Sequence, residues 1–369
     1  MTTISAEERI AMRDSFARLL EQRADEEALR KAIDTDTGFN TALWQEMAEM
    51  GVLGLLIDPE LGGIGGDAIL LEMLMEEAGS RLLCGPFIST AVVASSLISA
   101  STNEDVKSQM LSEIVAGQLT IALALTGSKG LWTSDGIDVT AQQNGDSWQL
   151  NGNSSFVMHA ETAGSILAIA KVDNDIRAFL VAPNAPGVET STLKTNDPTL
   201  RLSQITLSGA AGQLLEGVDD VAVNNAMNLA RIALAGEQAG GVKRIFDITI
   251  DYLQTRYQFG RQIGSYQAMK HMAADMLVEV ESATSAARHA AEAYAKGSSE
   301  AQALINLAGF ACADAYRDVT AQAIQMHGGI AYTWEHPAHL YWRRARTGLW
   351  LFGSSDHHRD QYLSQLEAA

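Results

Sequence analysis

The sequence is poor in cysteine, and its 369 residues include only Cys84 and Cys312. Two cysteines so far apart give neither a disulfide framework nor a metal-ligand spacing. No apolar run is long enough to span a bilayer, and the N-terminus lacks the basic head and apolar segment of a secretion signal. These absences predict a protein of the reducing cytoplasm, without a metal site and without membrane insertion.

Basic residues are also scarce, since 26 Lys and Arg stand against 45 Asp and Glu, for a net charge of −19. A nucleic-acid partner requires a basic surface, so this composition argues against one. A small anionic ligand is still possible, because it needs only a local cluster of positive charge. The length and the apolar fraction of 47% predict a large core spread over two or three domains.

The pattern of apolar residues changes twice along the chain and predicts an α+β fold with three domains. Residues 1–117 have helical periodicity, beginning with a capping box at Ser5-Ala-Glu-Glu. Residues 118–218 contain short apolar runs separated by turn signals, which predict an antiparallel β domain. The turn signals are Asn144-Gly145, Asn151-Gly152 and Asp173-Asn-Asp. Residues 219–369 return to helical spacing and predict a four-helix bundle.

Two short motifs stand at corners between the long helices of this last region. The first is Arg256-Tyr-Gln-Phe259-Gly, with Gln267 shortly after it. The second is Gln325-Met-His-Gly328-Gly329. Glycine permits the left-handed backbone that ends one helix so that another can start, so an ordinary capped corner would explain either motif alone.

Together, the two motifs resemble those of the acyl-CoA dehydrogenase flavoprotein family. The resemblance implies that both corners reach across a subunit interface and hold the diphosphate and adenosine of a partner's FAD. A fixed arginine cation and exposed glycine amides suit a diphosphate. The implied cofactor is FAD, and the implied partners include an acyl-CoA substrate and an electron-transfer flavoprotein. The FAD-binding residues expected on this basis are Arg256, Phe259, Gln267, Gln325, Gly328 and Gly329.

Members of this family oxidise an acyl-CoA thioester to the 2,3-enoyl-CoA, using a carboxylate as the base. Phe352 stands where most members carry that glutamate, and Ala230 stands where a smaller group carries it. Neither side chain accepts a proton. Glu237, two helical turns beyond Ala230, is either a displaced base or an ordinary ion-paired carboxylate. We expect the neighbouring His357 and His358 to be surface or interface residues.

The segment expected to face the chain's own flavin also departs from the family. The run Thr126-Gly-Ser-Lys-Gly-Leu-Trp132 keeps the family's threonine but lacks its Glu-Pro pair. Phe156-Val-Met158 replaces Trp-Ile-Thr, and methionine has no hydroxyl donor. The residues lent to a partner's cofactor are therefore kept, while those for the chain's own cofactor and substrate are not.

This asymmetry resembles the non-catalytic subunit of the heteromeric α2β2 bacterial acyl-CoA dehydrogenases. In those assemblies a homologous catalytic subunit supplies the base, and the substrates include steroid side-chain CoA thioesters. Two alternatives stay open at this point. One is a self-sufficient homomeric dehydrogenase that uses Glu237, and the other is a flavin-free scaffold of the same fold.

Overall fold

Helices occupy the first third of the chain, as the sequence predicts. The computed structural model describes residues 4–145, 147–173 and 175–368. The helices of this region are α1 (Ala6–Arg23), α2 (Glu26–Ile33), α3 (Thr41–Glu49), α4 (Ala68–Ser80), a π-helical segment (Ile88–Ala94) that continues into α5 (Ser95–Ser99), and α6 (Glu104–Val115). The predicted capping box is confirmed, because Ser5 and Glu8 exchange backbone-to-side-chain hydrogen bonds at the start of α1. Residues 1–3, part of the N-terminus expected to lack a secretion signal, lie outside the described residues.

A seven-stranded sheet follows, and most of its pairings are antiparallel. Its strands are β1 (Ile121–Ala124), β2 (Thr140–Asn144), β3 (Ser147–Met158), β4 (Ser165–Val172), β5 (Asp175–Val181), β6 (Val188–Thr192) and β7 (Leu202–Leu214). The prediction of a purely antiparallel domain is wrong in one respect, since β4 pairs in parallel with both β1 and β2. A parallel pair requires a crossover connection between its strands, and short apolar runs do not reveal strand direction.

The turn expected at Asn151-Gly152 is also wrong, because both residues lie inside β3. The register between β3 and β7 shifts there, and Gly152 has φ +134°. A glycine within a strand often marks such an irregularity rather than a reversal of the chain. The turn at Asn144-Gly145 does separate β2 from β3, whereas the turn expected at Asp173–Asp175 includes Asn174, which lies outside the described residues.

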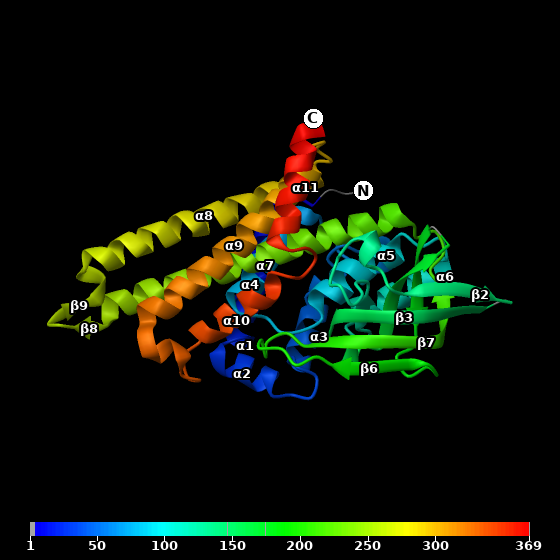
Figure 1. Ribbon diagram of the computed structural model, residues 1–369, viewed down its shortest axis with the longest axis horizontal. Coiled ribbons are helices and arrows are strands. Elements are labelled where there is room, and N and C mark those ends of the chain that lie inside the picture. The colour runs from blue at the N-terminus through cyan, green and yellow to red at the C-terminus, as the bar shows by residue number, and fades with distance from the viewer. Residues whose placement is uncertain (1–3, 146, 174, 369) are drawn as a thin grey trace.

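The last region is the predicted helical bundle. Its helices are α7 (Asp220–Thr255), α8 (Gln267–Ala295), α9 (Ala301–His327), α10 (Ala338–Gly348) and α11 (Ser355–Ala368), and the two-stranded hairpin of β8 (Tyr257–Gln258) and β9 (Arg261–Gln262) joins α7 to α8. Helices α7, α8 and α9 pack on one another and α11 packs on α9. Figure 1 places the sheet at one end of the long axis and the β8–β9 hairpin at the other. In the part of the chain that is described, no helix is long and apolar enough to cross a membrane.

Helix α4 of the N-terminal region packs closely on α7 because glycines line the contact. A Cβ atom added to Gly79 would lie 1.9 Å from the carbonyl oxygen of Glu237, and one added to Gly240 would lie 1.8 Å from that of Glu76. Neither space admits a side chain. The close approach fixes α7, which carries Ala230 and Glu237, against the N-terminal helices.

The same contact buries Glu72, which is 1% exposed and has one carboxylate oxygen without a hydrogen-bond partner. Burial, together with repulsion from Glu76, raises the pKa of Glu72 to about 8, although Arg288 opposes the shift. A carboxyl group whose pKa is higher in the folded chain than in the unfolded chain destabilises the fold progressively as the pH rises above the unfolded value.

We therefore predict a pH-dependent difference in stability between the wild-type chain and Glu72→Gln. One pKa unit corresponds to about 1.4 kcal/mol, so between pH 5 and pH 8 the wild type should lose on the order of 3 kcal/mol of unfolding free energy relative to the variant. Urea unfolding across this range measures the difference. The exposed Glu279→Gln is the control and should follow the wild type; parallel profiles for wild type and Glu72→Gln would contradict the prediction.

Candidate functional site

The first corner motif forms an exposed hairpin at the tip of the molecule. Arg256 follows the end of α7, and its guanidinium donates no hydrogen bond to, and forms no ion pair with, any described residue. Phe259 is 93% exposed and has a left-handed backbone with φ +53°. Gly260 has no atom within 4 Å of an added Cβ position. An unpaired cation and an exposed ring are thus presented outward.

The second corner lies beside the first. Gln325 is exposed near the end of α9, and both Gly328 and Gly329 face open space. The ring of His327 stacks on Tyr252, one turn before the end of α7, with ring centroids 4.6 Å apart. This stacking joins the two motifs. We call residues 256–267 and 325–329 together the hairpin end.

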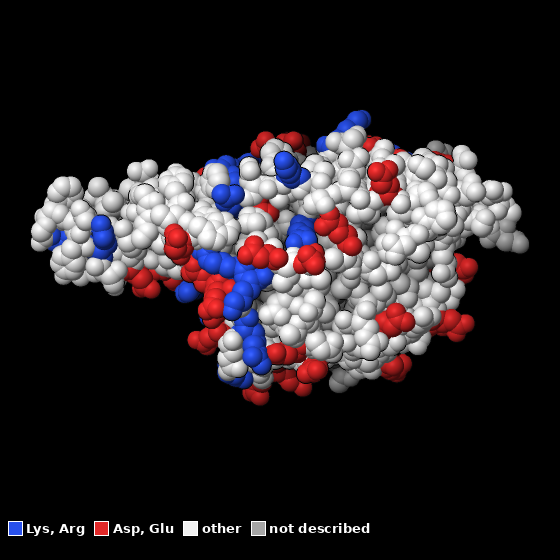
Figure 2. All heavy atoms as spheres, turned by 90° about the horizontal axis from the view of Figure 1, so that it is seen from below, with Lys and Arg blue, Asp and Glu red and all other residues white. Residues whose placement is uncertain are grey.

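The hairpin end is locally basic within an acidic protein. Residues 252–274 contain Arg256, Arg261 and Lys270 but no Asp or Glu. On the face in Figure 2, basic side chains are visible at this tip, at the left of the view. Arg261 is held over the ring of Tyr266, 3.9 Å from its centroid, while Arg256 is left free to meet a ligand. Such a surface attracts an anion.

All six predicted FAD-binding residues are exposed, and they come from the two corners of the hairpin end. They fit the dinucleotide part of FAD, because Arg256 can pair with a diphosphate and the open glycines allow its oxygens to approach backbone amides. The seven-stranded sheet, with the loop at 126–132 and Met158, lies at the opposite end of the long axis from these six residues (Figure 1).

The two family base positions are both sealed inside the chain. Phe352 and Ala230 are each 0% exposed. The Phe352 ring packs edge-on against Trp132, with centroids 4.9 Å apart, and Arg231 Nε donates to the Phe352 carbonyl at 3.1 Å. Trp132 itself is anchored by a 2.8 Å hydrogen bond from its indole nitrogen to the Trp350 carbonyl. Neither Phe352 nor Ala230 has a side chain that accepts a proton, and aromatic packing fills the space at Phe352.

The loop at 126–132 is satisfied by bonds within the chain. Thr126, the retained threonine, is fully buried and donates its hydroxyl to the Leu131 carbonyl at 2.6 Å. The Asp138 carboxylate accepts from both the backbone and the hydroxyl of Ser128, and these bonds lower the pKa of Asp138. Met158 is 6% exposed. These residues do not fit a flavin ring. The hydroxyl of Thr126 already donates to Leu131, and Met158 is apolar where the family carries a threonine.

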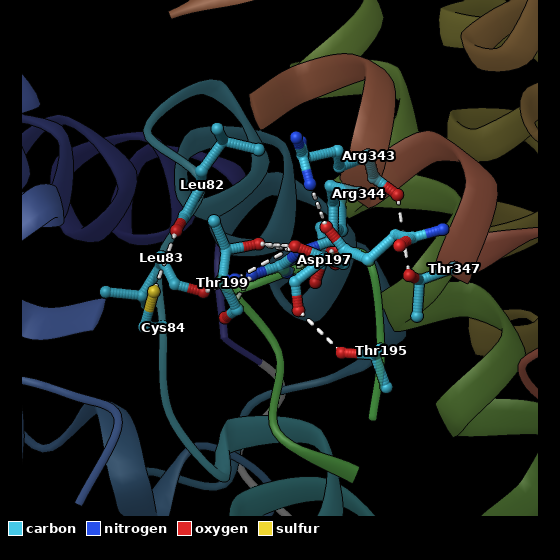
Figure 3. A network of polar contacts seen from close by, with 11 residues as sticks. Leu82, Leu83, Cys84, Thr195, Asp197, Thr199, Arg343, Arg344 and Thr347 are labelled. Carbon is cyan, nitrogen blue, oxygen red and sulfur yellow. Dashed lines mark hydrogen bonds and ion pairs between the residues drawn. The ribbon is translucent and has the colours of Figure 1, made fainter. Parts of the chain in front are cut away.

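Glu237 is an ion-paired carboxylate. Its Oε1 lies 2.9 Å from Nη1 of Arg344, which is almost fully buried. The carboxylate of Asp197, also buried, lies 3.4 Å from Nε of the same arginine. That Nε also donates a hydrogen bond of 2.8 Å to the hydroxyl oxygen of Thr199. Figure 3 shows Arg344, Asp197 and Thr199 meeting beside Leu83, whose carbonyl faces the guanidinium. Burial alone would lower the pKa of Arg344, but the two carboxylates outweigh it and the pKa is raised.

The space next to Glu237 is small. Glu237 lines a cavity of about 30 Å³ together with Met158, Leu351 and Arg344. That volume holds roughly one water molecule. A base needs room for the α-carbon of a substrate beside it, so this arrangement does not favour Glu237 as a displaced base.

A larger cavity, of about 430 Å³, lies between the sheet, α7, α9 and α11. Arg231 and His357 line it, with amide side chains from all three helices. We expected His358 to be a surface or interface residue, and the surface position is wrong, because it is 3% exposed and its Nδ1 lies 2.9 Å from Asn306 Oδ1 within the chain. Burial and the nearby Arg231 lower the pKa of His358 to about 3. The loop before α11 turns its ring inward, which adjacent positions in a sequence do not reveal.

Three residues that the sequence did not single out as functional organise these regions. Arg344 was visible only as one of two adjacent arginines, Trp132 only as the end of an altered loop, and Asp138 as one of many acids. Trp132 and Arg344 have partners far away in the sequence, namely Trp350 and Asp197, whereas Asp138 binds the nearby Ser128. No local pattern encodes the two distant partners.

Comparison with known proteins identifies the family of the chain. Residues 6–118 match the model of the acyl-CoA dehydrogenase N-terminal domain, and residues 220–366 match that of the C-terminal domain. The chain belongs to the acyl-CoA dehydrogenase family. The fold, with helices on both sides of a central β region in the sequence, is that of acyl-CoA dehydrogenases. Within this family, the sequence of the chain is similar to that of curated proteins over almost its whole length.

Two of these relatives are both named acyl-CoA dehydrogenase IpdE2. The protein from Mycolicibacterium smegmatis is 31% identical over 98% of this chain and 99% of its own length. The protein from Mycobacterium tuberculosis is 30% identical over 92% of this chain and 91% of its own length.

Solved structures share the fold at lower sequence identity. The ChsE4-ChsE5 complex from Mycobacterium tuberculosis contains a chain that matches with a TM-score of 0.91 at 23% identity, covering 100% of both chains. A variant of the "Tcur3481-Tcur3483 steroid ACAD" matches with a TM-score of 0.88 at 24% identity, covering 98% of both chains.

We predict that Arg344→Met destabilises this acyl-CoA dehydrogenase chain strongly, because it leaves the carboxylates of Asp197 and Glu237 without their cation. Removing one partner of a buried ion pair costs about 3–5 kcal/mol. Urea unfolding at pH 7 measures this loss. The exposed Arg346 on the same helix is the matched control, and Arg346→Met should change stability by less than about 1 kcal/mol. Equal effects of the two substitutions would refute the role assigned to Arg344.

Proposed function

We propose that this chain is a non-catalytic subunit of an FAD-dependent acyl-CoA dehydrogenase that completes the cofactor site of a homologous catalytic subunit. The observation that carries the proposal is the contrast between two sites. The hairpin end is exposed and basic with open glycines, whereas the Phe352 site is sealed by aromatic packing. The first can serve only another chain, and the second leaves this chain without a base.

In this proposal Arg256 pairs with the diphosphate of the partner's FAD and the amides around Gly328 and Gly329 approach its oxygens. The exposed ring of Phe259 and the amides of Gln267 and Gln325 contact the rest of the dinucleotide. When bound, FAD supplies the acceptor for the hydride that leaves the acyl β-carbon. The partner's carboxylate removes the α-proton, since Phe352 and Ala230 cannot.

The assembly and the substrate are further parts of the proposal. Two structural neighbours are described as pairs, ChsE4-ChsE5 and Tcur3481-Tcur3483, and the second is described as a steroid ACAD. These descriptions support an α2β2 heterotetramer and a steroid side-chain CoA thioester as substrate. By resemblance, an electron-transfer flavoprotein would accept the electrons. The three domains would span residues 1–117, 118–218 and 219–369, in the reducing cytoplasm.

The first test compares the chain alone with the chain co-expressed with its candidate partner. Purified alone it should be colourless and inactive with an artificial electron acceptor, whereas the complex should be yellow with one FAD per pair. Arg256→Ala should remove most of the FAD from the complex, because the diphosphate loses its cation. Lys270→Ala, also at the basic end but outside both motifs, is the control. Full turnover and one FAD per chain in the isolated protein would defeat the proposal.

The second test addresses the alternative in which Glu237 is a displaced base. Glu237→Gln keeps a hydrogen-bond acceptor for Arg344 but cannot remove a proton. Under the proposal, the complex should retain its turnover and its FAD, because Asp197 and Thr199 still hold Arg344. Loss of turnover with FAD still bound would instead favour the self-sufficient enzyme. A complex that forms without any flavin would favour the scaffold alternative.

A further inference from the structure

Three histidines lie together behind the second corner of the hairpin end. His327 ends α9, His336 lies in the loop that follows, and His339 is in the first turn of α10. The ring centroids of His327 and His336 are 4.5 Å apart, and His339 packs against Trp334 at 5.2 Å. His327 and His339 are 4% and 6% exposed, so the cluster forms the buried base of the 328–337 loop.

The hydrogen bonds show which ring nitrogens are free of protons. His327 Nδ1 lies 2.8 Å from the Ala323 carbonyl and must therefore donate, which leaves its Nε2 as a buried lone pair without a partner. His336 Nδ1 accepts the backbone N–H of Ala338 at 3.2 Å and must therefore be unprotonated. Ala338 is the first residue of α10, after the N-cap residue Pro337, so His336 accepts one of the N–H groups that are free at the start of that helix.

The surroundings do not favour a positive charge. Arg30 of α2 stacks over Trp334, and its nearest carboxylate, Glu26, is already paired with it. Arg343 projects from α10, Arg244 and Tyr252 face the region from α7, and Glu335 is exposed in the loop itself. Burial first, and then repulsion from His327, lowers the pKa of His336, and burial lowers the pKa of both His327 and His339.

We propose that this histidine cluster is an acid-sensitive latch on the second corner of the hairpin end. A proton on His336 Nδ1 removes the acceptor for Ala338 N–H at the start of α10. A proton on His327 Nε2 puts a charge into a buried stack with no acceptor. Both events loosen the 328–337 loop from α10 and from Tyr252, and so release Gly328 and Gly329 from their positions.

The lowered pKa values of the three histidines decide whether the loop opens in acid or in base. A histidine that binds its proton less well in the closed loop than in the open loop stabilises the closed form above its ordinary pKa of about 6.5 and loses that contribution as the pH falls. The latch is therefore closed at neutral pH and opens in acid. Its consequence for FAD rests on the proposed function, whereas the loosening of the loop does not.

Hydrogen–deuterium exchange on the full chain tests the latch directly. Protection factors, corrected for the intrinsic pH dependence of exchange, should fall by about tenfold or more for amides of residues 328–340 between pH 7 and pH 5. Amides in the middle of α8 should keep their protection. His336→Asn offers a side-chain oxygen to Ala338 N–H but cannot take a proton, so it should flatten the fall. The exposed His289→Asn is the matched control and should behave as the wild type does.

Three outcomes would overturn the inference: a wild-type chain with no loss of protection in acid, a loss of equal size throughout α8, or a His336→Asn variant that loosens as much as the wild type. If that variant were unfolded at pH 7, His327→Asn would replace it, because its amide can still donate to the Ala323 carbonyl. A second readout is the fluorescence of FAD released from the yellow complex on acidification. Loop opening in a complex that never holds FAD would sustain the latch and reject the proposed function.

Discussion

The ion pairs of Arg344 are the contact on which the positions of the three regions depend. Its guanidinium, on α10 of the bundle, meets Glu237 on α7, Asp197 and Thr199 in the segment between β6 and β7, and the carbonyl of Leu83 after α4. The loop after α4, the segment between β6 and β7, and two helices of the bundle thus share one buried cation. A buried charge is tolerated only when its partners are fixed, so the orientation of the sheet relative to the bundle is fixed with it.

That fixed frame explains why the chain presents one kind of site outward and closes another. The close α4–α7 contact through Gly79 and Gly240 holds α7 straight to its far end, where Arg256 begins the hairpin. The same helix carries Ala230 and Arg231 past the sheet, where Arg231 holds the Phe352 carbonyl and Trp132 fills the space in front of it. One rigid helix therefore serves an open site at its end and a closed one along its length.

The sequence allowed the family, the order of the regions and the two corner motifs to be predicted, because each depends on local patterns. Helical spacing predicts α7, α8 and α9, and a capping box predicts the start of α1. The sequence did not reveal the parallel pairing of β4, the continuity of β3 through Asn151-Gly152, or the buried position of His358. These features depend on which distant segments meet. The partnership of Glu237 with Arg344 has the same origin, since 107 positions separate the two residues.

The edge-on packing of Trp132 against Phe352 has a consequence for substitutions at either position. A glutamate at position 352 would place its carboxylate against the indole of Trp132, which now packs on the Phe352 ring. Shortening Trp132 would leave a void beside Phe352 and destabilise the fold. Either change, a glutamate at position 352 or a shorter side chain at Trp132, is therefore unfavourable when made alone. Trp132 and Phe352 therefore form one packing unit, in which a substitution of either ring changes the surroundings of the other.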